Sequence, residues 1–135
     1  MTSSRRVNLS VVDSSGWLEY MTEGPNASFF ASAIEAPDHL VVPTISILEV
    51  FKHVLRERGE DAALQAAALM QQGRVVELDV ALSIRAAQLG LQHRLPPADS
   101  VILATCEAHG ARLWTQDRDF QGIPGVQYRE KPKPA

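Results

Sequence analysis

The chain alternates between short apolar runs and longer amphipathic segments. The short runs are rich in β-branched residues and are bounded by turn-forming residues, which is typical of buried strands. This pattern predicts strands at 7–12, 39–43, 74–78 and 111–116, with a further edge strand at 125–129. It predicts helices at 15–21, 26–36, 45–58, 60–72, 80–93 and 95–110.

Residues with strong positional preferences support several helix boundaries. Ser14 or Ser15 is expected to cap the first helix, because a hydroxyl oxygen accepts a free backbone N–H there. Thr44 and Asp79 are expected to cap the helices 45–58 and 80–93 in the same way. Pro97 suits the first turn of the helix 95–110, where its missing N–H costs nothing.

Strands that are separated by helices throughout predict an α/β fold. We expect a three-layer α/β/α sandwich with a mostly parallel central sheet, formed by a single domain over 1–130 with a solvated tail at 131–135. Right-handed crossovers bring the carboxyl ends of parallel strands to one edge, where ligands bind in such sheets. The residues that directly follow the strands are therefore the first candidates for a functional site.

Composition narrows the class of protein. The 45% of hydrophobic and 21% of charged residues are ordinary for a soluble globular domain. A net charge of −3 argues against coating nucleic acid through a global field, but it leaves local binding open. The single Cys106 cannot form an internal disulfide, and no run approaches the roughly 18 apolar residues of a membrane span. We expect a cytoplasmic protein that has no contact with membranes.

Acidic residues follow two of the predicted strands. Asp13 comes directly after the first strand, and Asp117 and Asp119 come after the strand 111–116. If both strands are central and parallel, all these carboxylates meet at one edge. Like charges about 5–6 Å apart repel by a few kcal/mol near a protein surface, so a cation is expected there. The alternatives are a helix cap for Asp13 and an Asx turn for Asp117.

Asp99 lies at the centre of the apolar stripe of its helix, near the amino-terminal end. The stripe consists of Ile102, Leu103, Cys106 and Gly110. A carboxylate that faces the core is costly unless it is paired or bound to a metal. The alternative is a first-turn acid that complements the helix dipole, which accounts for the charge but not for the facing.

Glu49 is ambiguous by spacing alone. It points away from the apolar stripe of the helix 45–58, so a solvated acid that pairs with Lys52 or His53 is the simpler interpretation.

Four stretches together resemble a PIN domain, and most closely the VapC-type ribonuclease toxins. They are "VVDSS", "TISILEVF", "PPADSVILATCEAHGARLWTQDRDF" and "IPGV". The resemblance extends from Val11 to about Val126, and the stretch from Pro97 to Phe120 is its most specific part. It implies a PIN-like fold and a metal-dependent endoribonuclease.

The resemblance also implies a four-acid catalytic site. The catalytic acids would be Asp13, Glu49, Asp99 and Asp117, of which Asp13, Asp99 and Asp117 would contribute most to metal binding. Glu49 would position water or a second ion, Asp119 would be a further acid at the rim, and Ser14 and Thr115 would support the site by hydrogen bonding. Hard carboxylate oxygens suit Mg²⁺, or alternatively Mn²⁺.

Partners follow from the same resemblance. A cognate VapB-type antitoxin would cover the acid cleft, the toxin would form a homodimer, and operator DNA would be bound only through the antitoxin. Candidates for antitoxin contacts are Phe29, Phe30, Phe51 and Leu55, and candidates for RNA contacts are Arg85, Arg94, Arg112 and Arg118. Trp17 is expected in helix packing or a dimer contact and Trp114 in the core, with base stacking as the alternative.

Two other functions can be compared with the sequence. A phosphotransfer receiver domain needs a lysine at the end of a late strand. Lys52, the only lysine before the tail, lies in a predicted helix, so this rival is excluded. A non-catalytic PIN-like module that binds RNA or protein would lack some of the acids, and none is missing.

Overall fold

The computed structural model describes residues 8–133, so Val7 of the predicted first strand and the last two residues of the predicted tail lie outside the described part. The strands are β1 (Ser10–Val12), β2 (Val41–Pro43), β3 (Arg74–Val76), β4 (Arg112–Thr115) and β5 (Val126–Tyr128). The α-helices are α1 (Ser14–Met21), α2 (Ala27–Ile34), α3 (Thr44–Arg58), α4 (Glu60–Met70), α5 (Val80–His93) and α6 (Pro97–His109). Two 3-10 helices, η1 (Pro37–His39) and η2 (Arg118–Phe120), follow α2 and β4.

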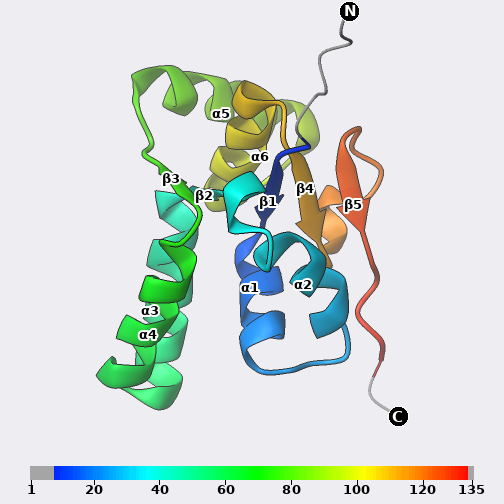
Figure 1. The fold of residues 1–135 in the computed structure, drawn as a ribbon. Helices are drawn as coiled ribbons and strands as arrows, with labels where there is room; N and C mark the ends of the chain where they lie inside the picture. The colour runs from blue at the N-terminus through cyan, green and yellow to red at the C-terminus, as the bar shows by residue number, and fades with distance from the viewer. Residues whose placement is uncertain (1–7, 134–135) are drawn as a thin grey trace, which may run out of the picture.

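Every strand pairing within residues 8–133 is parallel. β4 lies between β1 and β5, and β2 pairs with β3. A parallel bridge between Ser10 and Leu40 joins the two groups, which gives the order β5-β4-β1-β2-β3. The predicted parallel sheet is confirmed, and the two strands that precede the acids are neighbours (Figure 1).

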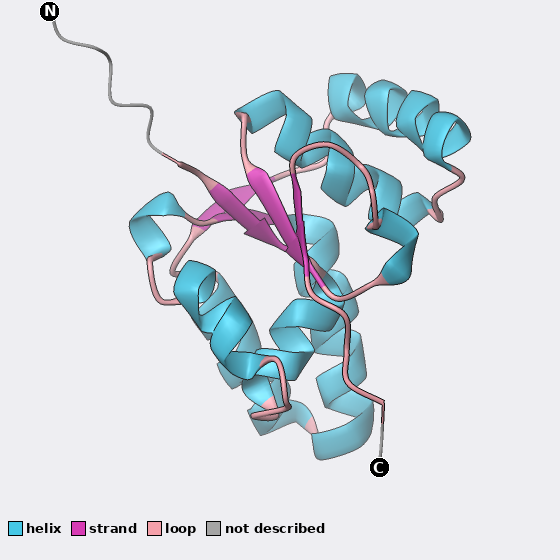
Figure 2. Cartoon of the chain, turned by 90° about the vertical axis from the view of Figure 1, so that its right-hand side faces the viewer, coloured by secondary structure: helices cyan, strands magenta, loops and turns pink. Residues whose placement is uncertain are grey.

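The sheet divides the hydrophobic core in two, because successive strand residues face opposite sides. Val11 and Leu113 pack with buried residues of α5 and α6. Their neighbours Val12 and Trp114 pack with residues of α1 to α4 on the other face. Helices therefore cover both sides of the strands (Figure 2), and the predicted three-layer α/β/α sandwich is confirmed.

Two of the predicted helix caps are wrong. α1 begins at Ser14, and its cap is Asp13 rather than Ser14 or Ser15, because the Asp13 carboxylate accepts the N–H of Gly16 at 2.9 Å. Thr44 is the first residue of α3 and makes no capping bond, since Pro43 holds the cap position. Asp79 caps α5 by accepting the N–H of Leu82 at 2.8 Å, as predicted.

The other boundaries differ by a few residues. Pro97 opens α6 as predicted. α2 and α4 are shorter than the predicted 26–36 and 60–72, and the 3-10 helix η1 begins at Pro37 after the end of α2. Within the described residues, no helix combines the length and the apolar character that crossing a membrane requires.

The two tryptophans belong to the core. Trp17 is fully buried, which excludes the predicted dimer contact through this side chain. Trp114 is partly buried, and its indole N–H donates to the Ser10 hydroxyl at 3.0 Å. Its ring lies against Phe29, with the ring centroids 5.1 Å apart.

Candidate metal centre

Asp13 joins the first strand to the first helix and is 2% exposed. Its backbone N–H donates to the carbonyl of Trp114 at 3.2 Å, which continues the β1–β4 ladder by one residue. One carboxylate oxygen caps α1, and the other accepts the Thr115 hydroxyl at 2.7 Å. The Ser15 hydroxyl donates to the same carboxylate at 3.0 Å. Asp13 is therefore held by β4, by the α1 terminus and by a neighbouring serine.

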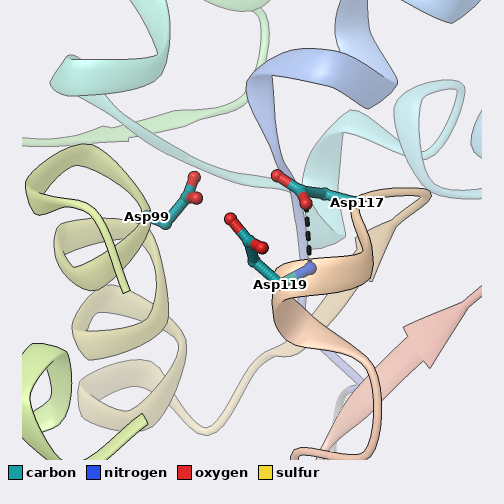
Figure 3. A group of neighbouring side chains, drawn as sticks. All are labelled: Asp99, Asp117 and Asp119. Atoms are coloured by element: carbon teal, nitrogen blue, oxygen red, sulfur yellow. Dashed lines mark hydrogen bonds between the residues drawn. The ribbon is translucent and has the colours of Figure 1, made fainter. Parts of the chain in front are cut away.

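Asp117 and Asp119 follow β4, where Asp117 caps η2 and Asp119 lies within it. The Asp117 carboxylate accepts the N–H of Asp119 at 2.9 Å, which is the Asx turn that the sequence allowed as an alternative (Figure 3). The N–H of Asp117 donates to the hydroxyl of Thr115 at 2.9 Å. The turn therefore fixes the backbone and still leaves the two carboxylates directed toward α6.

Asp99 faces these two acids from the first turn of α6. Asp99, Asp117 and Asp119 each offer a carboxylate oxygen, and these oxygens lie within 4.8 Å of one another (Figure 3). We call these three residues the acid triad. Asp119, which the sequence placed at the rim, is the exposed member of this group, whereas Asp13 lies outside the group.

Glu49 reaches the same region from α3. Its carboxylate accepts the hydroxyl of Ser14 at 2.5 Å. This bond joins α3 to the first residue of α1, and it replaces the pairing with Lys52 or His53 that spacing favoured. His53 instead lies 3.3 Å from a guanidinium nitrogen of Arg56.

The carboxylates act on one another electrostatically. Burial raises the pKa of Asp99 to about 7, with further increases from the charges of Asp117, Asp13, Glu49 and Asp119. The five acids therefore lie close enough to act on one another, although they come from four separate parts of the chain. A group of this kind becomes favourable as a set of anions only when positive charge neutralises it.

The pKa of Asp13 is also raised, but hydrogen bonds to its carboxylate oppose part of the rise. Burial raises its pKa to about 6, and the charge of Asp117 adds to the rise. Hydrogen bonds from Thr115, Gly16 and Ser15 oppose the rise, because they stabilise the carboxylate.

The four candidate RNA-binding arginines separate into two groups. Arg118 lies between Asp117 and Asp119, and Arg94 ends α5 just before the start of α6, so both belong to the edge with the acids. Arg112 begins β4 at the opposite edge of the sheet. Arg85 pairs with Glu107 at 2.6 Å, eight residues and about 12 Å along α6 from Asp99. Arg85 and Arg112 therefore lie away from the acid triad, whereas Arg94 and Arg118 lie at the same edge as the acids.

The chemistry of the donor set fits a hard divalent cation. The acid triad supplies only carboxylate oxygens, which are the ligands that Mg²⁺ and Mn²⁺ prefer. Burial, and after it the charges of the other acids, raise the pKa of Asp99, so its ionised form is costly until a cation is bound. Each acid expected from the sequence is present in this region.

Comparison with known proteins assigns the family. The PIN domain family model matches residues 10–126, and the chain belongs to this family. It is 34% identical over 98 residues to Ribonuclease VapC4 of Mycobacterium tuberculosis, an alignment that covers 64% of this chain and 72% of that protein. The resemblance to VapC-type proteins is thereby confirmed.

Solved structures confirm the PIN fold. A toxin–antitoxin complex from Klebsiella pneumoniae aligns with a TM-score of 0.71 and 24% identity, over 87% of this chain and 95% of that chain. The sarcin–ricin loop cleaving toxin VapC20 of Mycobacterium tuberculosis aligns with a TM-score of 0.71 and 21% identity, over 86% and 95%. At these identities the likeness establishes the fold alone.

Proposed function

We propose that this protein is a metal-dependent endoribonuclease toxin, which hydrolyses RNA phosphodiester bonds in the cytoplasm and is neutralised by a cognate antitoxin. The observation that carries the proposal is the acid triad, with three carboxylate oxygens within 4.8 Å of one another in a chain of the PIN domain family. Support for the RNA substrate comes from Ribonuclease VapC4, which is 34% identical to this chain. A non-catalytic module would not need such a costly cluster of charges.

Each acid has a proposed role that follows from its position. Asp99 and Asp117 of the acid triad bind the cation together with Asp13, which Thr115 links to Asp117, and Asp119, the third member of the triad, contributes a further oxygen. Glu49, held by Ser14, orients a water molecule or a second ion. When bound, Mg²⁺ or Mn²⁺ would lower the pKa of the attacking water and neutralise charge on the phosphate. Thr115 supports the site by fixing both Asp13 and the backbone of Asp117.

The decisive experiment incubates the purified protein with a panel of RNAs in Mg²⁺, in Mn²⁺ and in EDTA. We expect cleavage with either cation, and loss of cleavage in EDTA and in Asp99→Asn. Asp79→Asn is the matched control, because Asp79 is also an acid at a helix amino terminus but caps α5 outside the cluster. Cleavage that persists in EDTA, or in Asp99→Asn at the wild-type rate, would contradict the proposal.

The proposed antitoxin surface is a groove between the α1–α2 pair and the α3–α4 pair. The groove has a volume of about 850 Å³, and apolar side chains line it, including Leu18, Met21, Val54 and Leu69. The groove has an acidic lining, because its charged residues are three glutamates, Glu23, Glu35 and Glu57, and one arginine, Arg58. An amphipathic antitoxin helix with basic flanking residues fits this combination. From the groove, α1 leads back to Ser14 and the acids, so a chain extending beyond such a helix would reach the cleft.

This groove replaces most of the antitoxin contacts predicted from composition. Phe30 is fully buried in the core, so its prediction as a contact is wrong. Phe29 and Phe51 are partly buried and pack against the same core. Leu55 is 44% exposed on α3 and remains a candidate contact.

The proposed dimer surface is the outer face of α5. Val80, Ile84 and Leu91 are 76%, 58% and 87% exposed, and with Ala87 they recur at the spacing of a helix-pairing seam. No charged side chain lies along this seam, so a second copy of the same chain meets it without repulsion between like charges. Packing two such helices antiparallel places Val80 of one copy opposite Leu91 of the other.

A further inference from the structure

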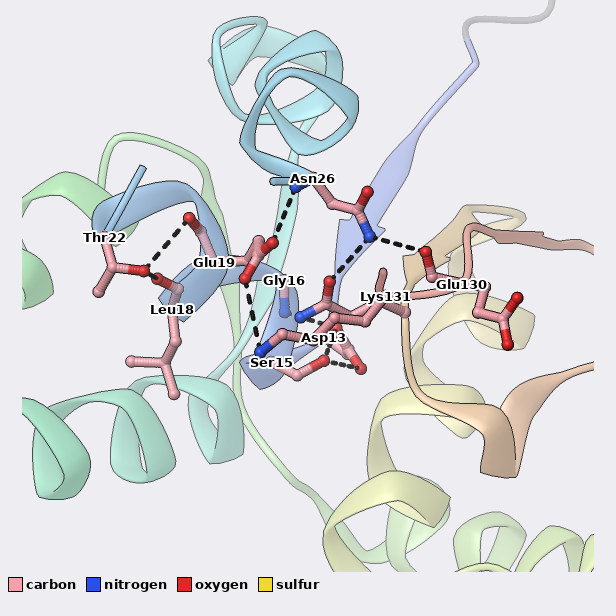
Figure 4. Close-up of polar contacts among 10 residues, drawn as sticks. Asp13, Ser15, Gly16, Leu18, Glu19, Thr22, Asn26, Glu130 and Lys131 are labelled. Carbon is pink, nitrogen blue, oxygen red and sulfur yellow. Dashed lines mark hydrogen bonds and ion pairs between the residues drawn. The ribbon is translucent and has the colours of Figure 1, made fainter. Parts of the chain in front are cut away.

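Asn26 holds the cap position of α2 but does not act as a cap. Asparagine at this position ordinarily accepts a backbone N–H from the first turn of its helix, and the Asn26 side chain makes no such bond. Its amide nitrogen instead donates to Oε1 of Gln116 at 3.1 Å. It also donates to the backbone carbonyl of Glu130 at 3.2 Å (Figure 4). The side chain is thereby directed to the carboxyl end of β4, where the acids lie.

The orientation of this amide follows from its partners. The carbonyl of Glu130 can only accept, so the Asn26 atom that faces it must be the NH₂ group. The same NH₂ group faces Gln116, which must present its own oxygen. Asn26 thus uses its amide as a two-donor clamp between the end of β4 and the segment after β5. Because Asn26 is only 3% exposed, water does not readily replace these bonds.

Asn26 is itself anchored from α1. Its backbone N–H donates to a carboxylate oxygen of Glu19 at 2.8 Å, and Glu19 is 5% exposed. Lys131 places its ammonium nitrogen 3.9 Å from the other oxygen of that carboxylate (Figure 4). Gly24 makes room for the arrangement, since a Cβ at that position would lie 2.5 Å from the Glu19 carboxyl group. The clamp therefore rests on a buried, charged support rather than on a flexible loop.

The clamped residue Gln116 lies between two residues of the acid site. Thr115 before it binds the Asp13 carboxylate, and Asp117 after it belongs to the acid triad. The carbonyl of Thr115 also accepts the N–H of Arg129 at 3.0 Å, so the segment after β5 holds the residue before Gln116 directly. Repulsion between the carboxylates of the acid triad favours movement of Asp117, and of the chain that follows β4, away from Asp99. The clamp on Gln116 opposes that movement.

We infer that Asn26 is a positioning residue for the metal centre: through Gln116 its amide keeps the Asp117 carboxylate beside Asp99 before a cation binds. The inference rests on the proposed metal-dependent function. The site then includes two neutral amides besides the acids: Asn26 in the α1–α2 turn and Gln116 at the end of β4. Neither Asn26 nor Gln116 contacts the reacting atoms, so their effect passes through the position of Asp117.

The test measures Mn²⁺ affinity by isothermal titration calorimetry, together with thermal melting in EDTA, for Asn26→Ala, Gln116→Ala and the double variant. We expect each single variant to bind Mn²⁺ about tenfold more weakly, as for other residues that orient metal ligands. The double variant should bind no more weakly than the weaker single variant, because both changes open the same clamp. Gln116 is partly exposed, so Gln116→Ala keeps the test valid if Asn26→Ala does not fold.

Two control variants separate positioning from general destabilisation. Met70→Ala removes a fully buried side chain of α4 and should lower the melting temperature without changing the Mn²⁺ affinity. Gln72→Ala removes an exposed glutamine and should change neither. Clamp variants that melt earlier but bind Mn²⁺ with wild-type affinity would overturn the inference. Failure of the wild-type protein to bind Mn²⁺ would instead overturn the proposed function.

Discussion

The hydroxyl of Thr115 donates to the carboxylate of Asp13 at 2.7 Å, although the two residues are 102 positions apart in the chain. The same hydroxyl oxygen accepts the N–H of Asp117 at 2.9 Å. One buried side chain at the end of β4 therefore fixes two of the proposed metal ligands at once. This relation joins the first strand of the sheet to the strand beside it and aligns the acids that follow them.

Replacing Thr115 by valine tests this relation, because valine keeps the shape and removes only the hydroxyl. The Asp13 carboxylate then loses a donor and the Asp117 N–H loses its acceptor. We expect a loss of about 1–3 kcal/mol in the free energy of unfolding, measured by urea denaturation in EDTA. Thr105→Val is the control, because its hydroxyl donates to the Val101 carbonyl within α6 and supports no acid. Equal losses in the two variants would contradict the relation.

Stability should depend on pH in a direction opposite to that of most acidic groups. The pKa of Asp99 is raised to about 7 and that of Asp13 to about 6, so the folded state binds more protons than the unfolded state above the ordinary pKa of 3.8. Without metal, stability is therefore lost as the pH rises from about 4 to about 7. We expect the melting temperature in EDTA to be higher at the lower end of this window.

Saturating Mg²⁺ should remove most of this pH dependence, because the cation favours the ionised carboxylates. Asp99→Asn should remove much of it in EDTA, since the half-buried asparagine side chain does not titrate and carries no charge. A melting temperature in EDTA that rises steadily from about pH 4 to about pH 8 would be inconsistent with the raised pKa values.

Gly16 allows the close approach of α1 to α2. A Cβ at this position would lie 2.6 Å from a ring carbon of Phe30 and 2.7 Å from a methyl group of Val12. Both neighbours are fully buried and cannot move freely. We expect Gly16→Ala to lower the free energy of unfolding by about 1–3 kcal/mol in chemical denaturation, as overpacking does. Gly59→Ala is not a suitable control, because φ at Gly59 is +89° and an alanine there would add backbone strain. Ser28→Ala, at an exposed position of α2, is the better control.

Substituting the candidate arginines should change the RNA affinity by different amounts, depending on whether the arginine lies at the edge of the sheet with the acids. In an Asp99→Asn background that does not cleave, we expect Arg118→Ala to weaken RNA binding and to reduce the salt slope by about 0.7, the effect of one lost phosphate contact. Arg85→Ala should leave both unchanged, because Arg85 pairs with Glu107 away from the acids. Fluorescence anisotropy over a salt series measures both. Equal effects of the two substitutions would show that the RNA path does not follow the acid edge.

The oligomeric state should depend on the outer face of α5. Placing a carboxylate in the seam with Ile84→Glu should convert a dimer to a monomer in sedimentation or light scattering, because two like charges would then meet. Ser83→Glu, at the neighbouring exposed position beside the seam, is the matched control and should leave the dimer intact. A wild-type protein that is monomeric at all concentrations would contradict the proposed surface.

Much of the acid site follows from the sequence, because parallel strands bring their carboxyl ends to one edge. That rule is sufficient for Asp13 and Asp117, and helical periodicity is sufficient for Asp99. Periodicity gave no reason to place Glu49 in the site, since its position depends on how α3 crosses α1 and meets Ser14. Only the family resemblance indicated it.

Other features depend on tertiary contacts that no local pattern contains. Asn26 before α2 looks like an ordinary helix cap, and its partners Gln116 and Glu130 are 90 and 104 positions away. Arg85 and Arg112 looked equivalent to Arg118 in the sequence, because the direction of a side chain relative to the sheet edges is set by the assembled layers. The strands lie where they were predicted, since apolar runs between turns are a local signal, although each is shorter than predicted and β3 is largely exposed.

The order of the strands has a consequence for a protein cut in two. A division between α4 and β3 would leave Asp13 and Glu49 on one fragment and Asp99 with Asp117 on the other. Each fragment would also lose a strand partner, since β1 pairs with β4 and β2 with β3 across the cut. Neither half would hold a complete set of acids, and rejoining them would restore the strand pairs and the set together. On the proposed function, the molecule could be converted into a conditional nuclease, inert as separate halves and active only when the two are brought together.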